Sequence, residues 1–593
     1  MDGRGVVLAL AVGILGSLGA ETAAVAAVRK AKRPNVVLIM SDDQGYGDLG
    51  SHGNPVIKTP NLDRLARQGV QLTRFHVCPV CSPTRASLLT GRYNYRTRVV
   101  DTYLGRSMMD PAEVTLAEML AAAGYRTGIF GKWHLGDNYP LRPIDQGFQE
   151  ALVHKGGGIG QPSDPPGGGS YFDPLLQHNG QTVATQGYCS DVYTDAALRF
   201  IEQDRERPFF VYLAFNAPHA PLQVPKKYLK MYDSLDLSPA AFPRVGQPLP
   251  AKLDHDMIAR VYGMVTNLDD NIGRLLARLD ALGLAEETIV VFLTDNGPQQ
   301  ARYNAGMRGR KGSVYEGGIH VPCFIRWTGK IPEGRQVDRI AAHIDLAPTL
   351  LELCDVGAPK GVQLDGRSLV PLLGIEAQAG TWPDRTLYFQ WHRGDVPGLG
   401  RACAALEQRW KLVQPAGAAP ERAAASDRYE LYDLEADPYE QHDVAAEHPE
   451  IVERLRKGYE AWFRDVSATR GYDPPRIVLG TSHENPSVLT RQDWRGPKAG
   501  WTPESLGFWE VQVGAAGNYR ITLHIAPAPT ARTARVRFRG VERAAPVADG
   551  ATSITIGPLH LEPGPGRLEA WVEAEPEGGK PIGVQFAEVE RID

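Results

Sequence analysis

The stretch Asn35-Val36-Val37-Leu38-Ile39-Met40 is followed directly by Ser41-Asp42-Asp43-Gln44. A short, unbroken apolar run of this kind predicts a strand that is buried on both faces. Two adjacent carboxylates at the end of a buried strand are costly unless they meet a cation. For this segment alone, a surface turn is the alternative interpretation.

The same pattern, a short apolar strand followed by polar side chains, occurs at three more places in the chain. The residues concerned are Lys132 and His134 after residues 125–130, His219 after residues 208–215, and Asp295 with Asn296 after residues 288–293. Each place alone is also compatible with an ordinary turn. In an open α/β sheet, however, the carboxyl ends of the strands line one crevice, so we expect these side chains to meet.

Helical patterns separate the predicted strands. We expect helices over residues 61–68, 116–123, 191–206, 254–282 and 345–354. Strands that alternate with helices predict an α/β fold, here a large, mostly parallel sheet flanked by helices.

A cysteine lies at the start of a further predicted helix. Cys81-Ser82-Pro83-Thr84-Arg85 continues through an apolar turn and stops at Gly91. Because Pro83 fits the first turn of a helix, Cys81 should lie among unpaired backbone N–H groups, which favour anions. Arg85 follows one turn later on the same face, and its guanidinium suits a tetrahedral oxyanion. A buried cysteine that caps a short helix is the alternative.

This segment resembles the signature of the type I sulfatases, which belong to the alkaline phosphatase superfamily. That signature is Cys-x-Pro-Ser/Thr-Arg followed by Leu-Thr-Gly-Arg. Similar motifs occur at Asp42-Asp43, at 131–136 (Gly-Lys-Trp-His-Leu-Gly), at 217–219 (Ala-Pro-His), at Asp295-Asn296 and at 309–322. In the last of these, His320 stands where the family often has arginine, which puts the structural contacts of that position in doubt.

The resemblance implies a modified nucleophile and a metal ion. In the family, the cysteine is oxidised to a formylglycine, whose hydrate is the nucleophile, so Cys81 would need a formylglycine-generating maturation enzyme. The implied calcium ligands are Asp42, Asp43, Asp295, Asn296 and the modified Cys81. Calcium is a hard ion that takes oxygen ligands, which is consistent with this set.

The resemblance also implies the roles of the other catalytic residues. These are Arg85, Lys132 and Lys311 on the sulfate, His134 on the hydrated aldehyde, and His219 on the leaving group. His154, His392 and Arg393 lie on predicted loops and are candidates for substrate contact. The expected enzyme is an arylsulfatase-like sulfuric ester hydrolase, and its partner a sulfated small molecule or glycan.

Other functions stay open at this point. A phosphonate monoester or phosphodiester hydrolase of the same superfamily could use the same modified cysteine. A non-catalytic glycan-binding protein is a different class, and a purely structural protein is a third. The intact polar residues at every strand end favour an enzyme.

The length of 593 residues predicts more than one domain. We expect a catalytic core over residues 29–379 and a smaller α+β subdomain over 380–472. A Gly/Pro-rich boundary at 471–486 precedes short strands between turns, which predict an all-β sandwich over 485–593.

Composition and the amino terminus bear on partners and location. The net charge of -5 gives no basic footprint for nucleic acid. Residues 1–28 resemble a signal peptide, with an apolar run from Val6 to Leu18 that is too short for a comfortable membrane span. We therefore expect a periplasmic or secreted protein without stable membrane insertion after cleavage, with an N-terminal anchor as the alternative. Six cysteines leave an odd set once Cys81 is modified, so one disulfide stays open.

Overall fold

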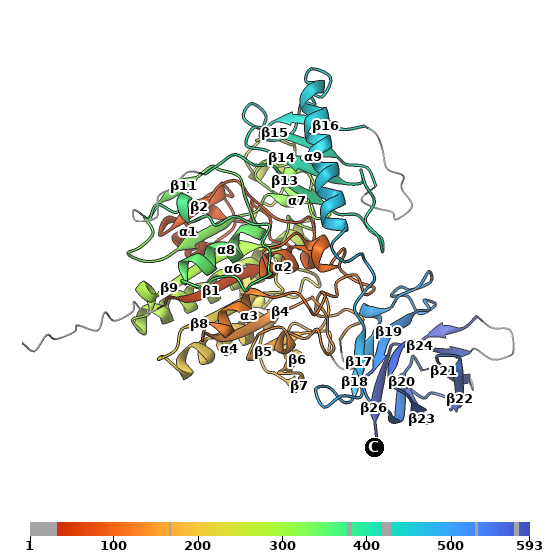
Figure 1. Cartoon of the computed structure of the whole chain (residues 1–593). Helices are drawn as coiled ribbons and strands as arrows, with labels where there is room; N and C mark the ends of the chain where they lie inside the picture. Colours follow the sequence, from red (N-terminus) through yellow and green to blue (C-terminus); the bar gives the residue numbers. More distant parts are fainter. Residues whose placement is uncertain (1–32, 165–167, 376–381, 418–427, 528–531, 574–579) are drawn as a thin grey trace, which may run out of the picture. The chain divides into compact units, whose positions relative to one another are not determined.

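The computed structural model describes residues 33–164, 168–375, 382–417, 428–527, 532–573 and 580–593. The predicted signal peptide, residues 1–28, lies outside these ranges. Within them, none of the helices combines the length and the apolar character of a membrane span. Figure 1 shows the arrangement of the elements.

A ten-stranded sheet with the order β11-β2-β10-β9-β1-β8-β4-β5-β6-β7 forms the centre of the fold. Its middle strands run parallel and are β9 (Thr288–Thr294), β1 (Asn35–Ser41), β8 (Phe209–Ala214), β4 (Arg126–Lys132) and β5 (Glu150–His154). The outer strands are β10 (Cys323–Arg326), β2 (Val70–Leu72), β11 (Arg335–Val337), β6 (Leu175–His178) and β7 (Gln181–Ala184). Both β10 and β6 join the parallel strands antiparallel, so the sheet is mixed at its edges.

Helices cover both faces of this sheet because β1 is apolar on both sides. Val36, Leu38 and Met40 pack into one core cluster, whereas Val37 and Ile39 pack into another. The first cluster includes α2 (Cys81–Thr90), α3 (Leu116–Ala122) and α8 (Leu346–Leu353). The second includes α1 (Pro60–Arg67), α4 (Cys189–Gln203) and α6 (His255–Ala281). The predicted α/β core is therefore confirmed.

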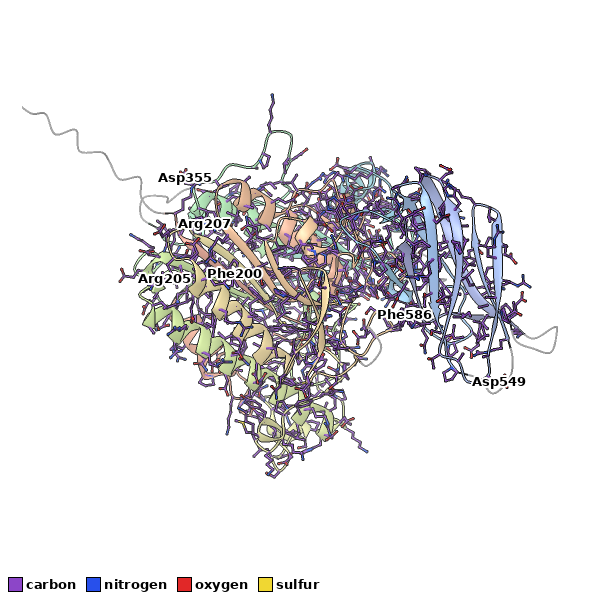
Figure 2. All side chains as sticks on the ribbon, turned by 90° about the horizontal axis from the view of Figure 1, so that it is seen from below. Phe200, Arg205, Arg207, Asp355, Asp549 and Phe586 are labelled. Atoms are coloured by element: carbon purple, nitrogen blue, oxygen red, sulfur yellow. The ribbon has the colours of Figure 1, made fainter. Side chains whose placement is uncertain are left out.

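Short elements complete the core. They are α5 (Lys226–Leu229), α7 (Glu316–Ile319) and the strand pair β3 (Phe75–His76) with β12 (Ala341–Ala342). Figure 2 shows Phe200 on α4, with Arg205 and Arg207 on the loop that leads into β8. The Arg126 guanidinium, at the start of β4, lies 4.5 Å from the centre of the Phe200 ring. This contact joins α4 to the amino-terminal end of β4.

A smaller antiparallel sheet follows the core. Its strands, in spatial order, are β13 (Leu387–Gln390), β14 (Cys403–Leu406), β15 (Trp410–Gln414) and β16 (Glu430–Asp433). The long helix α9 (Pro449–Ser467) packs on this sheet through Leu455, Tyr459 and Val466. The smaller α+β subdomain of the prediction has this architecture.

Two antiparallel-rich sheets form the C-terminal β-sandwich, which comprises β17 to β26. One sheet contains β17 (Ile477–Leu479), β19 (Phe508–Val513), β24 (Gly564–Glu573), β21 (Arg532–Phe538) and β22 (Val541–Val547), with β25 (Ile582–Gly583) beside β24. The other contains β18 (Ser487–Thr490), β26 (Phe586–Arg591), β20 (Gly517–His524) and β23 (Ser553–Leu561). Tyr519, Ile521 and Leu523 alternate along β20 and are buried against Trp509 of the facing sheet. The all-β part of the predicted fold class is confirmed, while the predicted domain boundaries stay predictions.

Four polar residues lie close together in the middle of helix α6. Asn267, Asp269 and Asn271 are buried, and Asp270 is exposed. Asp269 accepts hydrogen bonds from the backbone N–H groups of Asn61 and Leu62 at the start of α1. Asp269 therefore holds the start of α1 against α6.

Candidate active site

The carboxyl ends of β1 and β9 meet because these two strands are adjacent and parallel. Asp42 and Asp43 follow β1, and Asp295 and Asn296 follow β9; all are fully buried. The backbone N–H of Asp43 donates to Asp295 Oδ1 at 3.2 Å, and Asn296 Nδ2 donates to Asp43 Oδ1 at 2.7 Å. The structure therefore brings together the acidic residues that the sequence predicts at one edge of the sheet.

Several oxygens in this cluster have no hydrogen-bond partner among the described residues. They are Asp42 Oδ1, Asp43 Oδ2 and Asn296 Oδ1. Buried polar atoms without a partner are costly, and a cation would satisfy all of them at once. The ligand atoms of Asp42, Asp43 and Cys81 also lie within 4.8 Å of one another. This oxygen-rich set fits a hard divalent cation such as calcium.

Two lysines enter the same cluster. Lys132 Nζ lies 2.6 Å from Asp42 Oδ2, and Lys311 Nζ lies 2.6 Å from Asp43 Oδ1. Burial would lower the pKa of Lys311, but the Asp43 carboxylate raises it above the ordinary value. The Lys311 side chain is thus a charged ammonium group, and both lysines lie where an anionic substrate could contact them.

Arg85 lies one turn after Cys81, as predicted, but its charge has a partner. Arg85 Nη2 forms an ion pair with Asp295 Oδ2 at 2.8 Å, and Nη1 donates to the Lys132 carbonyl at 3.0 Å. In this arrangement Arg85 orients a predicted metal ligand and the end of β4. The sequence pattern could not show this pairing, because Asp295 is 210 residues away.

The acidic groups have unequal affinities for protons. Burial would raise the pKa of Asp43, but the Lys311 ammonium beside it lowers this pKa below its usual range. Burial and the Asp42 carboxylate raise the pKa of Asp295 to about 6, although Arg85 opposes this shift. A cation bound among these carboxylates would lower the pKa of Asp295 again.

Cys81 is the first residue of α2, and the helix ends at Gly91 in the left-handed conformation. Burial raises the pKa of the Cys81 thiol, so the unmodified side chain is a neutral thiol at neutral pH. A neutral buried thiol is a poor nucleophile. All six cysteines are buried and unpaired, so the disulfide that the sequence left open does not form here.

His134 follows β4 in a left-handed backbone conformation, with φ of 60°. Its Nε2 lies 2.7 Å from the Thr102 carbonyl oxygen, and its Nδ1 is buried without a partner among the described residues. Burial and the Lys132 ammonium lower the pKa of His134 well below its usual value. The imidazole is therefore neutral and carries its proton on Nε2, since a carbonyl oxygen only accepts.

His219 follows β8, which lies between β1 and β4 in the sheet. Its Nδ1 donates to the Ala220 carbonyl at 2.6 Å, and its Nε2 lies 3.9 Å from Asp43 Oδ2. Burial and the Lys311 ammonium lower the pKa of His219 to about 3. The neutral ring therefore presents an unprotonated Nε2 to the cluster.

Known proteins share this arrangement of sequence and structure. A family model described as Sulfatase matches residues 34–356, and one described as N-sulphoglucosamine sulphohydrolase, C-terminal, matches residues 310–462. The chain belongs to the sulfatase family. It is a sulfuric ester hydrolase of the alkaline phosphatase superfamily, as its sequence motifs predicted.

Individual sulfatases align over most of the chain. Arylsulfatase A from Homo sapiens is 33% identical over 508 residues, which cover 77% of this chain and 92% of that protein. N-acetylgalactosamine-6-sulfatase from Canis lupus familiaris is 32% identical over 396 residues, which cover 61% of this chain and 69% of that protein. The crystal structure of Ps i-CgsB in complex with k-i-k-neocarrahexaose has a TM-score of 0.63 and 26% identity, and covers 74% of this chain and 95% of its own.

The three candidate substrate contacts of this sulfatase differ in their surroundings. His154 ends β5 beside Lys132 of β4, and its Nε2 is buried without a partner among the described residues. His392 uses both ring nitrogens within its own loop, since Nδ1 donates to the Arg393 carbonyl and Nε2 accepts from Gly398 N. Arg393 forms an ion pair with Asp101 at 2.7 Å. Of the three, His154 has the free nitrogen that a ligand contact needs.

His320, which stands where the family often has arginine, still makes structural contacts. Its Nε2 donates to the Thr73 carbonyl at 2.7 Å, and its Nδ1 lies 2.9 Å from Glu316 Oε2. The doubt about this position therefore concerns packing between β2 and α7 rather than the catalytic cluster.

Two further polar residues, Gln44 and Asn216, lie at the strand ends but were not among the predicted site residues. Gln44 Oε1 and both polar atoms of the Asn216 side chain are buried without partners among the described residues. Both residues follow central strands, β1 and β8, so the rule that identified their neighbours could have included them. Thr102, whose carbonyl contacts His134, had no such signal.

Proposed function

We propose that this protein hydrolyses sulfate esters of carbohydrates, using a formylglycine made from Cys81 and a bound calcium ion. One observation carries the proposal. Buried oxygens of Asp42, Asp43 and Asn296 lack hydrogen-bond partners among the described residues, and Cys81 and two lysines lie in the same cluster. Such a cluster suits an anionic tetrahedral substrate and a cation together.

Two groups would supply chemistry that the encoded side chains lack. A hydrated formylglycine would supply a hydroxyl nucleophile in place of the neutral Cys81 thiol. Calcium held by Asp42, Asp43, Asp295 and Asn296 would polarise the sulfate and neutralise its charge.

The residues of the chain would perform the remaining tasks. Lys132 and Lys311 would exchange their carboxylate partners for sulfate oxygens and stabilise the charge of the transition state. Arg85 would keep Asp295 ionised and in position through their ion pair. These side chains need no rearrangement of the backbone, because Arg85, Lys132 and Lys311 already contact the carboxylates of the site.

Two neutral histidines would move protons at different steps. His219 presents its Nε2 to the cluster. The negative charge of a bound sulfate would raise the pKa of His219, so that its ring could protonate the departing alcohol together with Lys311. His134 presents an unprotonated Nδ1 and would accept the proton of the second hydroxyl when sulfate leaves.

Carbohydrate sulfates are the substrate class that the surroundings support best. Proteins similar to this chain include N-acetylgalactosamine-6-sulfatase and Ps i-CgsB, whose crystal structure is a complex with k-i-k-neocarrahexaose. A cavity of about 480 Å³ beside His154 is lined by Lys155, Arg142, His483 and Glu484. Polar walls of this kind suit the hydroxyl groups of a sugar chain.

Export is part of the proposal. The signal-like residues 1–28 support a periplasmic or secreted enzyme that meets sulfated glycans outside the cytoplasm. A formylglycine-generating enzyme would have to act on Cys81 of the same chain.

Release of anions by the matured protein tests the proposal. Sulfated oligosaccharides, an aryl sulfate, a phosphonate monoester and a phosphodiester are offered to the wild type and to Cys81→Ala. We expect sulfate release that is fastest on an oligosaccharide and absent in the variant. Faster cleavage of the phosphodiester or phosphonate would contradict the sulfatase assignment of the site, and sulfate release by Cys81→Ala would contradict the role of residue 81.

A further inference from the structure

The carbonyl oxygen of Thr102 receives two hydrogen bonds from distant parts of the chain. His134 Nε2 donates at 2.7 Å, and Gln492 Nε2 donates at 2.9 Å. Thr102 lies on the loop after the 3-10 helix that follows α2, whereas Gln492 lies in the 3-10 helix η9 (Arg491–Asp493) of the C-terminal β-sandwich. The β-sandwich thus reaches the residue that holds a candidate catalytic histidine.

The contact with Thr102 decides which nitrogen of His134 carries the proton. A carbonyl oxygen has two lone pairs and no hydrogen, so both of its partners must donate. His134 therefore holds its proton on Nε2 and leaves Nδ1 as a base inside the site. If Thr102 moved away, the ring could turn or take the other tautomer, and Nδ1 would no longer be available.

Gln492 is held firmly enough to fix this carbonyl. It is buried, its backbone N–H donates to Thr490 Oγ1, and its carbonyl accepts from Gly105 N at 2.9 Å. Its Nε2 also lies 3.2 Å from Ser107 Oγ. The side chain therefore bridges both ends of the loop that contains Thr102.

The β-sandwich core supports η9 from its other side. The three donor nitrogens of Arg491 bind the carbonyls of Gly583, Val584 and Thr502. Trp509 Nε1 donates to the Thr490 carbonyl at 2.7 Å. Gln492 is thus a side chain of the sandwich whose position the sandwich itself determines.

The opposite side of the loop is fixed by the smaller subdomain. Asp101 Oδ1 accepts from Thr102 N at 2.8 Å, from Arg393 Nη1 at 2.7 Å and from Trp391 Nε1 at 3.1 Å. Thr102 is therefore held through its N–H by Asp101 and through its carbonyl by Gln492. Of these two contacts, only the second shares an atom with His134.

We propose that Gln492 is a positioning residue, through which the β-sandwich sets the tautomer and orientation of His134 by way of the Thr102 carbonyl. This inference rests on the proposed function, in which His134 Nδ1 acts when sulfate leaves. It gives the β-sandwich a part in the reaction itself.

Replacement of Gln492 by methionine removes the donor and keeps the side-chain length. We expect kcat for sulfate release to fall about three- to tenfold, the range of one lost hydrogen bond, and KM to fall with it, so that kcat/KM stays nearly unchanged. Because the second step is slowed selectively, the alcohol should appear in a burst before sulfate. Gln512→Met is the matched control, since Gln512 lies half-buried in β19 and its Nε2 contacts only the neighbouring Val513 carbonyl in the described structure.

A Gln492→Glu variant separates positioning from folding. A protonated glutamic acid can still donate to the Thr102 carbonyl, whereas the ionised carboxylate faces that oxygen with its own lone pairs. We expect activity relative to wild type to be higher at about pH 5 than at about pH 8, where a carboxyl group is ionised. The same relative activity at both values would overturn the inference.

A readout that does not depend on activity completes the test. Crystal structures of the wild type and of Gln492→Met should show that the His134–Thr102 contact is lost or displaced in the variant. An unchanged contact, or wild-type kcat without a burst in a folded Gln492→Met protein, would overturn the inference. If the wild type itself releases no sulfate, the proposed function fails instead, and the two failures are distinguishable because only the latter appears without any substitution.

Discussion

Asp43 and His134 adopt left-handed backbone conformations, with φ of 66° and 60°, although neither is glycine. Such conformations cost about 1–3 kcal/mol each and persist where surrounding contacts fix them. Asp43 is fixed by Asp295 and Asn296, and His134 by Thr102. At both positions the strained backbone aims a polar side chain into the site.

Calcium binding should depend on the charge of Asp43. For the wild type we expect saturating calcium to raise the free energy of unfolding by about 3 kcal/mol at a hundredfold excess over Kd. Asp43→Asn removes one anionic ligand and leaves Lys311 without its partner, so the gain should shrink or vanish. Thermal unfolding with and without calcium measures the difference.

Asp549→Asn is the control for this substitution, because Asp549 is an exposed residue of the β-sandwich (Figure 2). It should respond to calcium as the wild type does. An equal response in Asp43→Asn would show that the ion binds elsewhere.

At the scale of elements, the segment around β3 depends on neutral buried histidines. His343 Nδ1 donates to the His76 carbonyl at 3.2 Å, and its Nε2 lies 3.3 Å from Cys78 Sγ. Burial lowers the pKa of His343 from 6.5 to about 4. Protonation of this ring is therefore disfavoured in the folded protein.

As a consequence, the protein should become less stable as the pH is lowered. Below about pH 6.5 the unfolded chain binds a proton at residue 343 that the folded protein does not bind until about pH 4. This group's contribution is thus present above pH 6.5 and lost on acidification, by about 2 kcal/mol at about pH 5. His343→Gln keeps a donor for the His76 carbonyl and does not titrate. Urea unfolding above pH 6.5 and at about pH 5 should show that the free energy of unfolding changes less with pH in the variant than in the wild type. An identical change in both proteins would refute this prediction.

The start of helix α1 should depend on Asp269 of α6. Its carboxylate accepts from Leu62 N at 2.7 Å and from Asn61 N at 3.1 Å. Loss of these capping bonds in Asp269→Ala should cost about 1–2 kcal/mol of stability, with kcat/KM unchanged. Asp270→Ala, which removes an exposed neighbour that contacts only Tyr228 in the described structure, should cost less. Chemical denaturation compares the two, and equal costs would argue against the cap.

The elements that sequence predicted well are those with strong local patterns. The central strands are unbroken apolar runs that end in polar residues, so both the strands and the polar residues after them could be predicted from the local pattern alone. β14, Cys403–Leu406, was missed because its Ala-rich run is short and has no alternation. β22, Val541–Val547, was missed because it is a mostly exposed edge strand that contains Pro546. In both cases the hydrogen bonds to neighbouring strands, rather than the local sequence pattern, stabilise the strand.

At the scale of the whole molecule, the β-sandwich and the core share buried apolar contacts. Leu104, Met108 and Leu141 of the core belong to the same cluster as Trp494 and Trp509. Long-range contacts of this kind leave no local signal, and Gln492, 390 residues from Thr102, is the clearest case. The sequence therefore predicted the sandwich but not its part in the site.

These shared contacts should couple the unfolding of the two regions. Met108→Ala should destabilise the protein by about 2–4 kcal/mol through the cavity that it leaves in the shared cluster. Calorimetry should show one transition that shifts as a unit. Met231→Ala, at a half-buried position near α5, should shift it less. Two separate transitions, of which Met108→Ala moves only one, would contradict the coupling.

The account depends most on the chemical state of residue 81. The mass of the peptide that contains it, measured in protein of known specific activity, tests this directly. We predict the mass of a formylglycine in place of cysteine, in a fraction that rises in proportion to sulfate release. Full sulfatase activity in protein whose residue 81 is entirely an unmodified thiol would contradict the account.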